Sequence, residues 1–250
     1  MKRKHREACY YCGSEACSDE HAPPRQMFKG FPCDSITVPS CEDHNSSKGG
    51  ADQAIVSAFL IPLHNGIGRY PLEDRVLKAI QIAQPSFERA KRRAVNSPLL
   101  KSPPEALKDL PNLAYLVPST NIGGWIRQLT AALVYNAVQA FDLTIKWPEA
   151  IVWSPDWVAA EGPASLELEQ AISILEKQRE IHLQLEQLTW EDGWSAHPRP
   201  YPSIIYAFQV RFEPNGEVIF KHRFYNRYTW YAWFSAAQET IAKLEEKLAV

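Results

Sequence analysis

The sequence predicts an α+β fold, and three observations lead to this prediction. All five cysteines of the 250-residue chain lie in the first 55 residues, whereas all eight tryptophans lie at position 125 or later. Residues 206–212 and 218–224 alternate apolar with polar side chains, as half-buried strands do. Residues 122–141 carry the Ala-, Leu-, Val- and Trp-rich composition of a buried helix. We therefore expect an N-terminal module at 1–60, and at 61–250 a mainly helical accessory region that ends in an antiparallel β-hairpin.

The remaining elements follow from apolar spacing and from the positions of proline and glycine. A loop at 64–71 places the boundary between the two parts near 55–70. The spacing predicts helices at 72–83, 165–188 and 235–248, and Pro85 can open another short helix. Five prolines at 97–118 indicate a linker packed on the surface.

The loop of the expected hairpin determines its register. A three-residue loop, Pro214-Asn215-Gly216, would pair Phe212 with Val218 and Phe208 with His222. A two-residue Asn-Gly turn would instead mix polar and apolar side chains on each face. Proline suits the first loop position and a left-handed glycine suits the third, so we predict the three-residue form. The aromatic face would then be buried. The other face would meet solvent or, alternatively, a phosphate backbone; it would carry Gln209, Arg211, Lys221 and Arg223.

The composition is that of a soluble globular protein. Charged residues make up 22% of the chain, which excludes wholesale disorder. The longest apolar run, at 54–63, is about half of the ~20 residues that a membrane-spanning helix needs. We therefore expect a cytoplasmic protein without a membrane partner. In a reducing compartment, clustered cysteines favour metal binding over disulfides.

Charge is unevenly distributed along the chain, although the net charge is only −2. Residues 69–101 hold eight basic and three acidic side chains, whereas residues 149–192 hold two basic and ten acidic ones. This asymmetry fits one face that meets phosphates, and it also fits two ordinary solvated helix faces. In the first case, one basic cluster would strengthen nucleic-acid binding without setting sequence choice. This cluster comprises Arg89, Lys91, Arg92 and Arg93.

The N-terminal module contains two short pairs of potential metal ligands. Cys9 and Cys12 form a Cys-x2-Cys pair, and Cys41 and His44 form a Cys-x2-His pair. Pairs with this spacing can form two knuckles that together deliver four ligands to one tetrahedral zinc ion. We therefore predict a structural zinc site at these four residues. The other two cysteines are expected to be free thiols or substitute ligands: Cys17 and Cys33.

Further polar residues surround these two pairs. Asp19-Glu20-His21 precedes two prolines, residues 35–39 have the composition of a strand, and Asn45 and Lys48 follow the second pair. In the order and spacing of these parts, residues 7–58 resemble the zinc-containing HNH endonucleases. In that family an acidic-His pair ends the first strand of a ββα-metal module, and a helix begins inside the second zinc knuckle. The resemblance implies such a module here.

The resemblance also implies an activity, namely hydrolysis of DNA phosphodiesters with 5′-phosphate and 3′-hydroxyl ends. His21 would take a proton from the attacking water. Glu20 or Asp19, together with the side-chain oxygen of Asn45, would hold a hard cation such as Mg²⁺. Lys48 would share a helix face with Asn45 and contact phosphate. By analogy with the family, a role in bacterial restriction or defence against phage is expected.

Several alternatives stay open from the sequence. His44 stands where the family usually has a cysteine, so it could bind the catalytic cation, and Asn45 would then lose its role. Ser35 stands where the family often has an asparagine that fixes the loop of the catalytic histidine. Residues 61–250 would read DNA, bind a protein partner or form a homodimer. The alternatives to a DNA nuclease are a zinc-stabilised binding module without catalysis and an RNA-directed nuclease.

Overall fold

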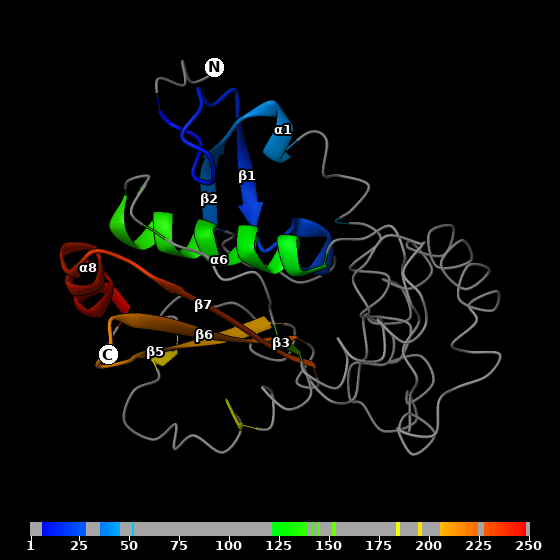
Figure 1. Ribbon diagram of the computed structural model, residues 1–250. Coiled ribbons are helices and arrows are strands. Elements are labelled where there is room, and N and C mark those ends of the chain that lie inside the picture. Colours follow the sequence, from blue (N-terminus) through cyan, green and yellow to red (C-terminus); the bar gives the residue numbers. More distant parts are fainter. Residues whose placement is uncertain are drawn as a thin grey trace, which may run out of the picture. The chain divides into compact units, whose positions relative to one another are not determined.

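The computed structural model describes residues 7–28, 36–45, 52, 122–139, 142, 145, 152–153, 184–185, 195–196, 206–224 and 228–248. The chain divides into two compact units: 1–50 with 124–151 and 189–250, and 51–123 with 152–188. The first unit contains most of the described elements and mixes helices with antiparallel strands (Figure 1). The predicted α+β class is confirmed at this level.

The C-terminal part of the first unit forms an antiparallel sheet. Its long strands are β5 (Tyr206–Phe212), β6 (Glu217–Phe224) and β7 (Tyr228–Ser235). The short strand β4 (Ser195–Ala196) pairs with β5, and β3 (Val152–Trp153), whose residues are counted with the second unit, completes the strand order β3-β7-β6-β5-β4. The predicted hairpin is thus part of a larger sheet, since β7 is not among the predicted elements.

The predicted register of the β5–β6 hairpin is confirmed. Phe212 pairs with Val218 and Phe208 with His222. The Glu213 carbonyl accepts a hydrogen bond from the Gly216 amide at 3.0 Å. Gly216 has a φ of 84°, the left-handed conformation that the third loop position requires.

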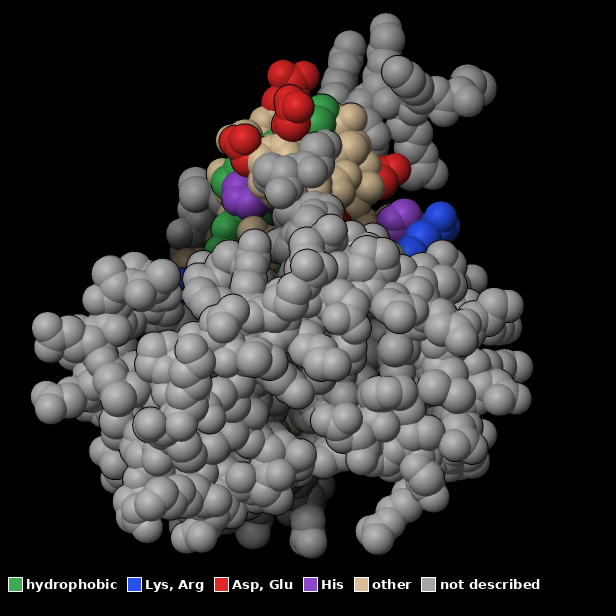
Figure 2. Space-filling model, turned by 90° about the vertical axis from the view of Figure 1, so that its right-hand side faces the viewer, with side chains coloured by type: hydrophobic (Ala, Val, Ile, Leu, Met, Phe, Trp, Pro, Cys, Tyr) green, Lys and Arg blue, Asp and Glu red, His purple; other side chains and the backbone are tan. Residues whose placement is uncertain are grey.

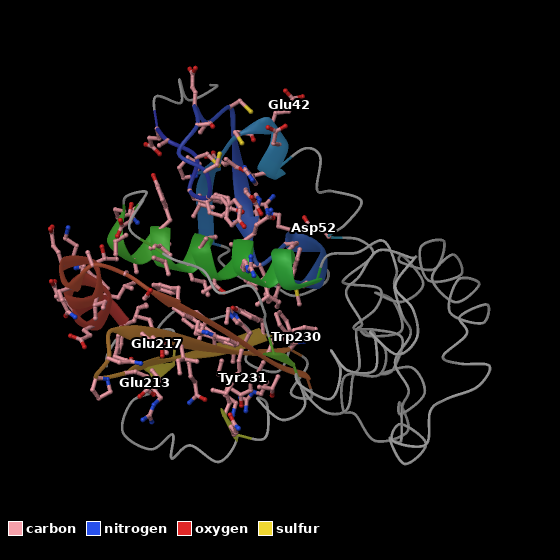
Figure 3. The ribbon with its side chains drawn as sticks, in the orientation of Figure 1. Glu42, Asp52, Glu213, Glu217, Trp230 and Tyr231 are labelled. Carbon is pink, nitrogen blue, oxygen red and sulfur yellow. The ribbon has the colours of Figure 1, made fainter. Side chains whose placement is uncertain are left out.

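One face of this sheet forms the core of the described C-terminal part. Its aromatic side chains are each at most 2% exposed. Burial contributes roughly 2 kcal/mol for each side chain of this size. Figure 3 shows Trp230 and Tyr231 on opposite sides of β7, in keeping with the alternation along a strand. The buried aromatic residues of this face are Tyr206, Phe208, Phe220, Phe224, Trp230 and Phe234.

Helix α6 (Ile122–Val138) packs on this aromatic face. The rings of Trp125 and Phe224 lie 5.7 Å apart between centroids, and the Thr130 hydroxyl lies 2.9 Å from Nε2 of His222. The helix confirms the prediction for 122–141, but it ends earlier because Gln139 turns into the left-handed region, with a φ of 56°. Helix α6 is buried on more than one side, as expected of a helix that is apolar all round. Its buried residues include Ile126, Leu129, Ala132, Leu133 and Val134.

Helix α8 (Gln238–Leu248) closes the described chain. The prediction for 235–248 is confirmed with a later start, because Ser235 is still the last residue of β7. Ile241, Leu244 and Leu248 are buried, and the Thr240 hydroxyl donates a hydrogen bond to the Asp142 carboxylate.

The N-terminal part consists of a short β-ladder and a first helical turn. Strand β1 (Ser18–Ala22) pairs antiparallel with β2 (Ile36–Ser40), so that Glu20 faces Val38 and His21 faces Thr37 across the ladder. The 3-10 helix η1 (Arg25–Phe28) follows β1 after a cis peptide bond between Ala22 and Pro23. Helix α1 (Glu42–Asn45) begins immediately after Cys41.

Several predicted features lie outside the described residues. They are the boundary near 55–70, the helices at 72–83 and from Pro85, the proline-rich 97–118, and all of 165–188 except 184–185. Among the described residues, no helix combines the length and the apolar character that crossing a membrane would require.

Candidate metal centre

Four side chains from the two predicted pairs converge at one end of the β1–β2 ladder. The sulfur atoms of Cys9, Cys12 and Cys41 and a ring nitrogen of His44 all lie within 4.8 Å of one another. The sulfurs of Cys12 and Cys41 are 3.7 Å apart. With zinc–sulfur bonds of about 2.3 Å, tetrahedral geometry requires a separation of about 3.8 Å between two sulfurs. The four atoms therefore form a set that fits a tetrahedral zinc ion.

The first knuckle is a tight turn that brings Cys9 and Cys12 together. The Cys9 carbonyl accepts a hydrogen bond from the Gly13 amide at 3.0 Å, and the Cys9 amide donates to the Ser14 carbonyl at 2.7 Å. Gly13 has a φ of 75°, which a residue with a side chain adopts only with strain. This turn is tied to β2 because the Tyr10 amide donates to the Pro39 carbonyl at 2.9 Å.

The second knuckle is the first turn of α1. The Asn45 amide donates to the Cys41 carbonyl at 3.1 Å, which places His44 beside Cys41. Nδ1 of His44 lies 3.1 Å from the Cys41 sulfur and 3.8 Å from the Cys9 sulfur, so His44 would bind the metal through Nδ1. The Tyr11 ring contacts the imidazole at a tilt of 55°, with 4.7 Å between the ring centroids. The structure thus groups His44 with the three thiols.

Burial and hydrogen bonding affect the thiols of this cluster in different ways. Burial, together with the neighbouring thiols, raises the pKa of Cys41 to about 11. Burial also opposes ionisation of Cys12, but hydrogen bonds with Ser14 and the neighbouring thiols outweigh it and lower the Cys12 pKa. Because thiolates are the form that binds zinc, loading the site would release protons.

A network of polar side chains joins α1 to β1 next to the metal cluster. The Asn45 side-chain amide donates to the Ser18 hydroxyl at 2.7 Å and to the Asp19 carbonyl at 3.2 Å. The Ser18 hydroxyl donates to the Ser40 carbonyl, and the Ser40 hydroxyl donates to a Glu20 carboxylate oxygen, both at 3.3 Å. Asn45 is therefore anchored on the strand that carries Glu20 and His21.

Because side chains alternate along β1, the two candidate carboxylates, Asp19 and Glu20, lie on opposite faces of the strand. Glu20 is only 5% exposed and points to the buried side, like Ala22. Asp19 is exposed, and its charge acts on His21. Of the two, Glu20 shares its face of β1 with Ser18, the partner of Asn45.

His21 is half-buried near the end of β1. Burial and the positive charge of Arg25 lower its pKa, while the charge of Asp19 acts in the opposite direction. The lowered pKa favours the neutral imidazole of His21 at pH 7, which is the form that a general base needs.

In the N-terminal part of the chain, at 7–28 and 36–45, acidic and basic side chains are exposed at different positions on the surface. Figure 2 shows acidic side chains gathered at its tip, and basic and histidine side chains side by side elsewhere on the same view. In Figure 3, Glu42 lies on α1 at the outer end of this part of the chain. The exposed acidic residues are Glu7, Glu15, Asp19, Glu42 and Asp43.

Other predicted site residues lie outside the described residues or away from the cluster. The predicted site residues outside the described part of the chain are Lys48, Arg89, Lys91, Arg92, Arg93 and Cys33. Cys17 is an exposed free thiol that is not part of the metal cluster. Sequence reasoning did not find the roles of Tyr11, Ser18 and Ser40. Only Gly13, a glycine directly after a Cys-x2-Cys pair, carries a local signal for its turn.

Comparisons with family models, with curated proteins and with solved structures find no match for this chain. Among the residues that the structure describes, the Cys9, Cys12, Cys41 and His44 cluster is the one group of three or more Cys, His, Asp or Glu side chains that converge as metal ligands.

Proposed function

We propose that this protein is a metal-dependent endonuclease of the HNH type, which hydrolyses DNA phosphodiesters on a zinc-stabilised N-terminal module. One observation carries the proposal. The turn of α1 that begins in the second knuckle places Asn45 on the backbone of β1, the strand that carries Glu20 and His21. This joins the metal cluster, an amide oxygen donor, a carboxylate and a neutral histidine within one small substructure.

In the proposed reaction, His21 acts as the general base. Its neutral imidazole accepts a proton from a water molecule whose oxygen forms a bond to phosphorus. The bond between phosphorus and the 3′ oxygen breaks, and its electron pair stays on that oxygen, which then takes a proton from solvent. The products are a 5′-phosphate and a 3′-hydroxyl.

Glu20 or Asp19, together with Asn45, would hold the catalytic cation; Glu20 lies on the face of β1 that carries Ser18, the partner of Asn45, and Asp19 lies on the face of His21. These are oxygen donors of the kind that Mg²⁺ prefers, and its remaining ligands would be water and phosphate oxygens. When bound, such a cation supplies positive charge near the leaving oxygen.

Zinc would act only as a scaffold at Cys9, Cys12, Cys41 and His44. Four protein ligands complete its tetrahedral coordination and leave no open position for water or substrate. The binding of His44 to zinc would leave Asn45, the next residue along α1, for the catalytic cation.

Nicking of supercoiled plasmid DNA tests the proposed activity. We expect the purified protein to nick and linearise plasmid with Mg²⁺, Mn²⁺ or Ni²⁺, and to stop when a chelator removes the added cation. His21→Ala should lose cleavage and keep its zinc, because His21 is not a zinc ligand. A parallel assay on single-stranded and double-stranded RNA decides whether DNA or RNA is the better substrate.

One observation favours a second candidate, a zinc-stabilised binding module without catalysis. Glu20 is buried and accepts a hydrogen bond from Ser40, and the alternation of β1 turns it away from the face of His21. If the protein binds nucleic acid and cuts neither DNA nor RNA with any of the three cations, this candidate replaces the nuclease.

A role in restriction or defence against phage rests on the nuclease proposal.

A further inference from the structure

The three cysteines of the metal cluster differ in their access to solvent. Cys9 is fully buried and Cys41 is only 8% exposed, whereas Cys12 is exposed. Zinc binds cysteine as the thiolate, and the thiolate is the form of cysteine that an oxidant attacks. Among thiolates, the exposed ones react first. Cys12 is therefore the sulfur of the cluster at which an oxidant from solvent reacts.

The Cys41 sulfur lies where it can react with an oxidised Cys12. The two sulfurs are 3.7 Å apart. A disulfide bond is about 2.05 Å long, so the sulfurs have to approach by about 1.7 Å. Cys41 directly follows β2, and its carbonyl accepts a hydrogen bond from the Asn45 amide, so its backbone is held on both sides. The approach thus falls mainly to the exposed side chain of Cys12 in the turn of the first knuckle.

We propose that Cys12 and Cys41 form a redox-sensitive pair: a hydroperoxide oxidises them to a disulfide, and the cluster then releases its zinc ion. This inference rests on the metal cluster and holds whether or not the module cuts DNA. After oxidation, the site keeps Cys9 and His44 as ligands, which are too few to hold a tetrahedral zinc ion.

Oxidation by hydrogen peroxide takes two steps. The Cys12 thiolate attacks one peroxide oxygen, so that an S–O bond forms, the O–O bond breaks and hydroxide leaves. The Cys41 thiolate then attacks the Cys12 sulfur, so that the S–S bond forms, the S–O bond breaks and a second hydroxide leaves. The sulfurs together lose two electrons, and the peroxide is reduced to two hydroxide ions, which take protons from solvent.

The position of this disulfide makes the release of zinc reversible. Cys12 belongs to the first knuckle and Cys41 to the second, so the bond keeps the two knuckles together after zinc has left. A bond between Cys9 and Cys12 would instead stay within one knuckle. A thiol reductant that cleaves the Cys12–Cys41 bond restores both thiolates side by side, and the site can bind zinc again.

The test treats the zinc-loaded full chain with hydrogen peroxide and follows released zinc with a chromogenic chelator, against a sample without peroxide. We expect the parent to release its zinc and to bind it again after dithiothreitol and zinc are added. Tryptic digestion without reduction locates the bond, because Cys12 lies in the peptide 7–25 and Cys41 in the peptide 30–48. We expect these peptides to be joined, with fragmentation placing the bond at Cys12 and Cys41. Any other disulfide in the zinc-free protein, such as Cys9–Cys12 within 7–25, overturns the proposal.

Two variants complete the test. Cys12→His keeps a zinc ligand that cannot form a disulfide, so it should retain zinc under conditions in which the parent loses it. Cys17→Ser removes an exposed thiol outside the cluster and should release zinc as fast as the parent. If Cys12→His binds no zinc, the peptide map of the parent decides alone. The proposal is also overturned if the parent keeps its zinc while Cys17 is oxidised, or if Cys17→Ser no longer releases it.

Discussion

His222 is a buried histidine whose hydrogen bonds determine its protonation. The Thr130 hydroxyl donates to the Ile126 carbonyl at 2.7 Å, so it accepts from Nε2–H of His222 at 2.9 Å. The remaining ring nitrogen, Nδ1, then accepts from the Tyr206 hydroxyl at 2.8 Å. Both nitrogens are satisfied in the neutral ring, and burial lowers the pKa of His222 to about 3. This residue ties β5, β6 and α6 together without a charge.

Acid should therefore weaken the fold through His222. In the unfolded chain, the imidazole binds a proton below its ordinary pKa of about 6.5, whereas the folded protein leaves it neutral down to about pH 3. The unfolded state thus gains protons in this window, and stability falls as the pH is lowered. We expect a loss of about 2 kcal/mol between pH 7 and pH 5, measured by urea denaturation.

The control for this prediction is His222→Gln, which keeps hydrogen-bonding capacity and cannot titrate. Its baseline stability will differ, so the slope of stability against pH is the quantity to compare. The variant should lose less stability than the parent between pH 7 and pH 5. Equal slopes would show that other groups cause the acid sensitivity.

At the scale of elements, the sequence predicted the strands whose two faces differ, and it predicted α6 from its apolar composition. In β5 and β6, polar residues such as Gln209 alternate with aromatic ones. The loop residues Pro214 and Gly216 favoured the three-residue loop, and this loop determines the observed register. Strand β7 has no such contrast. Tyr231 is as buried as its neighbours Trp230 and Ala232, so hydrophobicity along β7 has no period of two.

The site was predictable in part for a similar reason. The spacing of Cys9, Cys12, Cys41 and His44 predicts the two knuckles, and the structure brings these four side chains together. The hydrogen bonds of Ser18 and Ser40 connect residues 20 or more positions apart. Such contacts follow from the β1–β2 register, which no local pattern specifies.

The turn of the β5–β6 hairpin offers a test of one element. Gly216 has a φ of 84°, and a Cβ placed there would meet Gln238 at 3.5 Å, an ordinary contact. Backbone strain is therefore the main cost of a side chain. We expect Gly216→Ala to lower the free energy of unfolding by about 1 kcal/mol, and Gly216→Asn to lower it less because asparagine tolerates this conformation. If urea denaturation shows no difference between Gly216→Ala and the parent, the hairpin does not require the left-handed residue.

For the whole molecule, α6 links the metal cluster to the C-terminal sheet within one compact unit. Figure 1 shows α6 between the β1–β2 ladder and the sheet. Burial raises the pKa of Tyr11 in the first knuckle, and Arg127 of α6 acts against it. On its other side, the same helix meets the sheet through Trp125 and Thr130. Folding of the cluster and of the sheet should therefore be coupled.

Loss of the metal should therefore also destabilise parts of the structure beyond the first 45 residues. Structural zinc sites contribute roughly 10 kcal/mol or more to folding in small modules. We expect Cys12→Ser to lose zinc and to reduce hydrogen-exchange protection both in β2 and in α6. Cys17→Ser is the matched control, because Cys17 is a free thiol outside the cluster, and it should keep both zinc and protection. If Cys12→Ser loses zinc while α6 keeps its protection, the cluster folds independently of the sheet.

The central claim is that His21 and Asn45 have different roles in one catalytic site. A Mg²⁺ titration of plasmid cleavage by His21→Ala and Asn45→Ala, beside the parent, tests it most directly. Asn45→Ala loses a proposed cation ligand, so its cleavage should fall and then recover in part as Mg²⁺ rises. His21→Ala loses the proton acceptor, which more cation cannot replace, so its cleavage should stay absent at every concentration. A His21→Ala protein that cuts as fast as the parent at saturating Mg²⁺ would contradict the account.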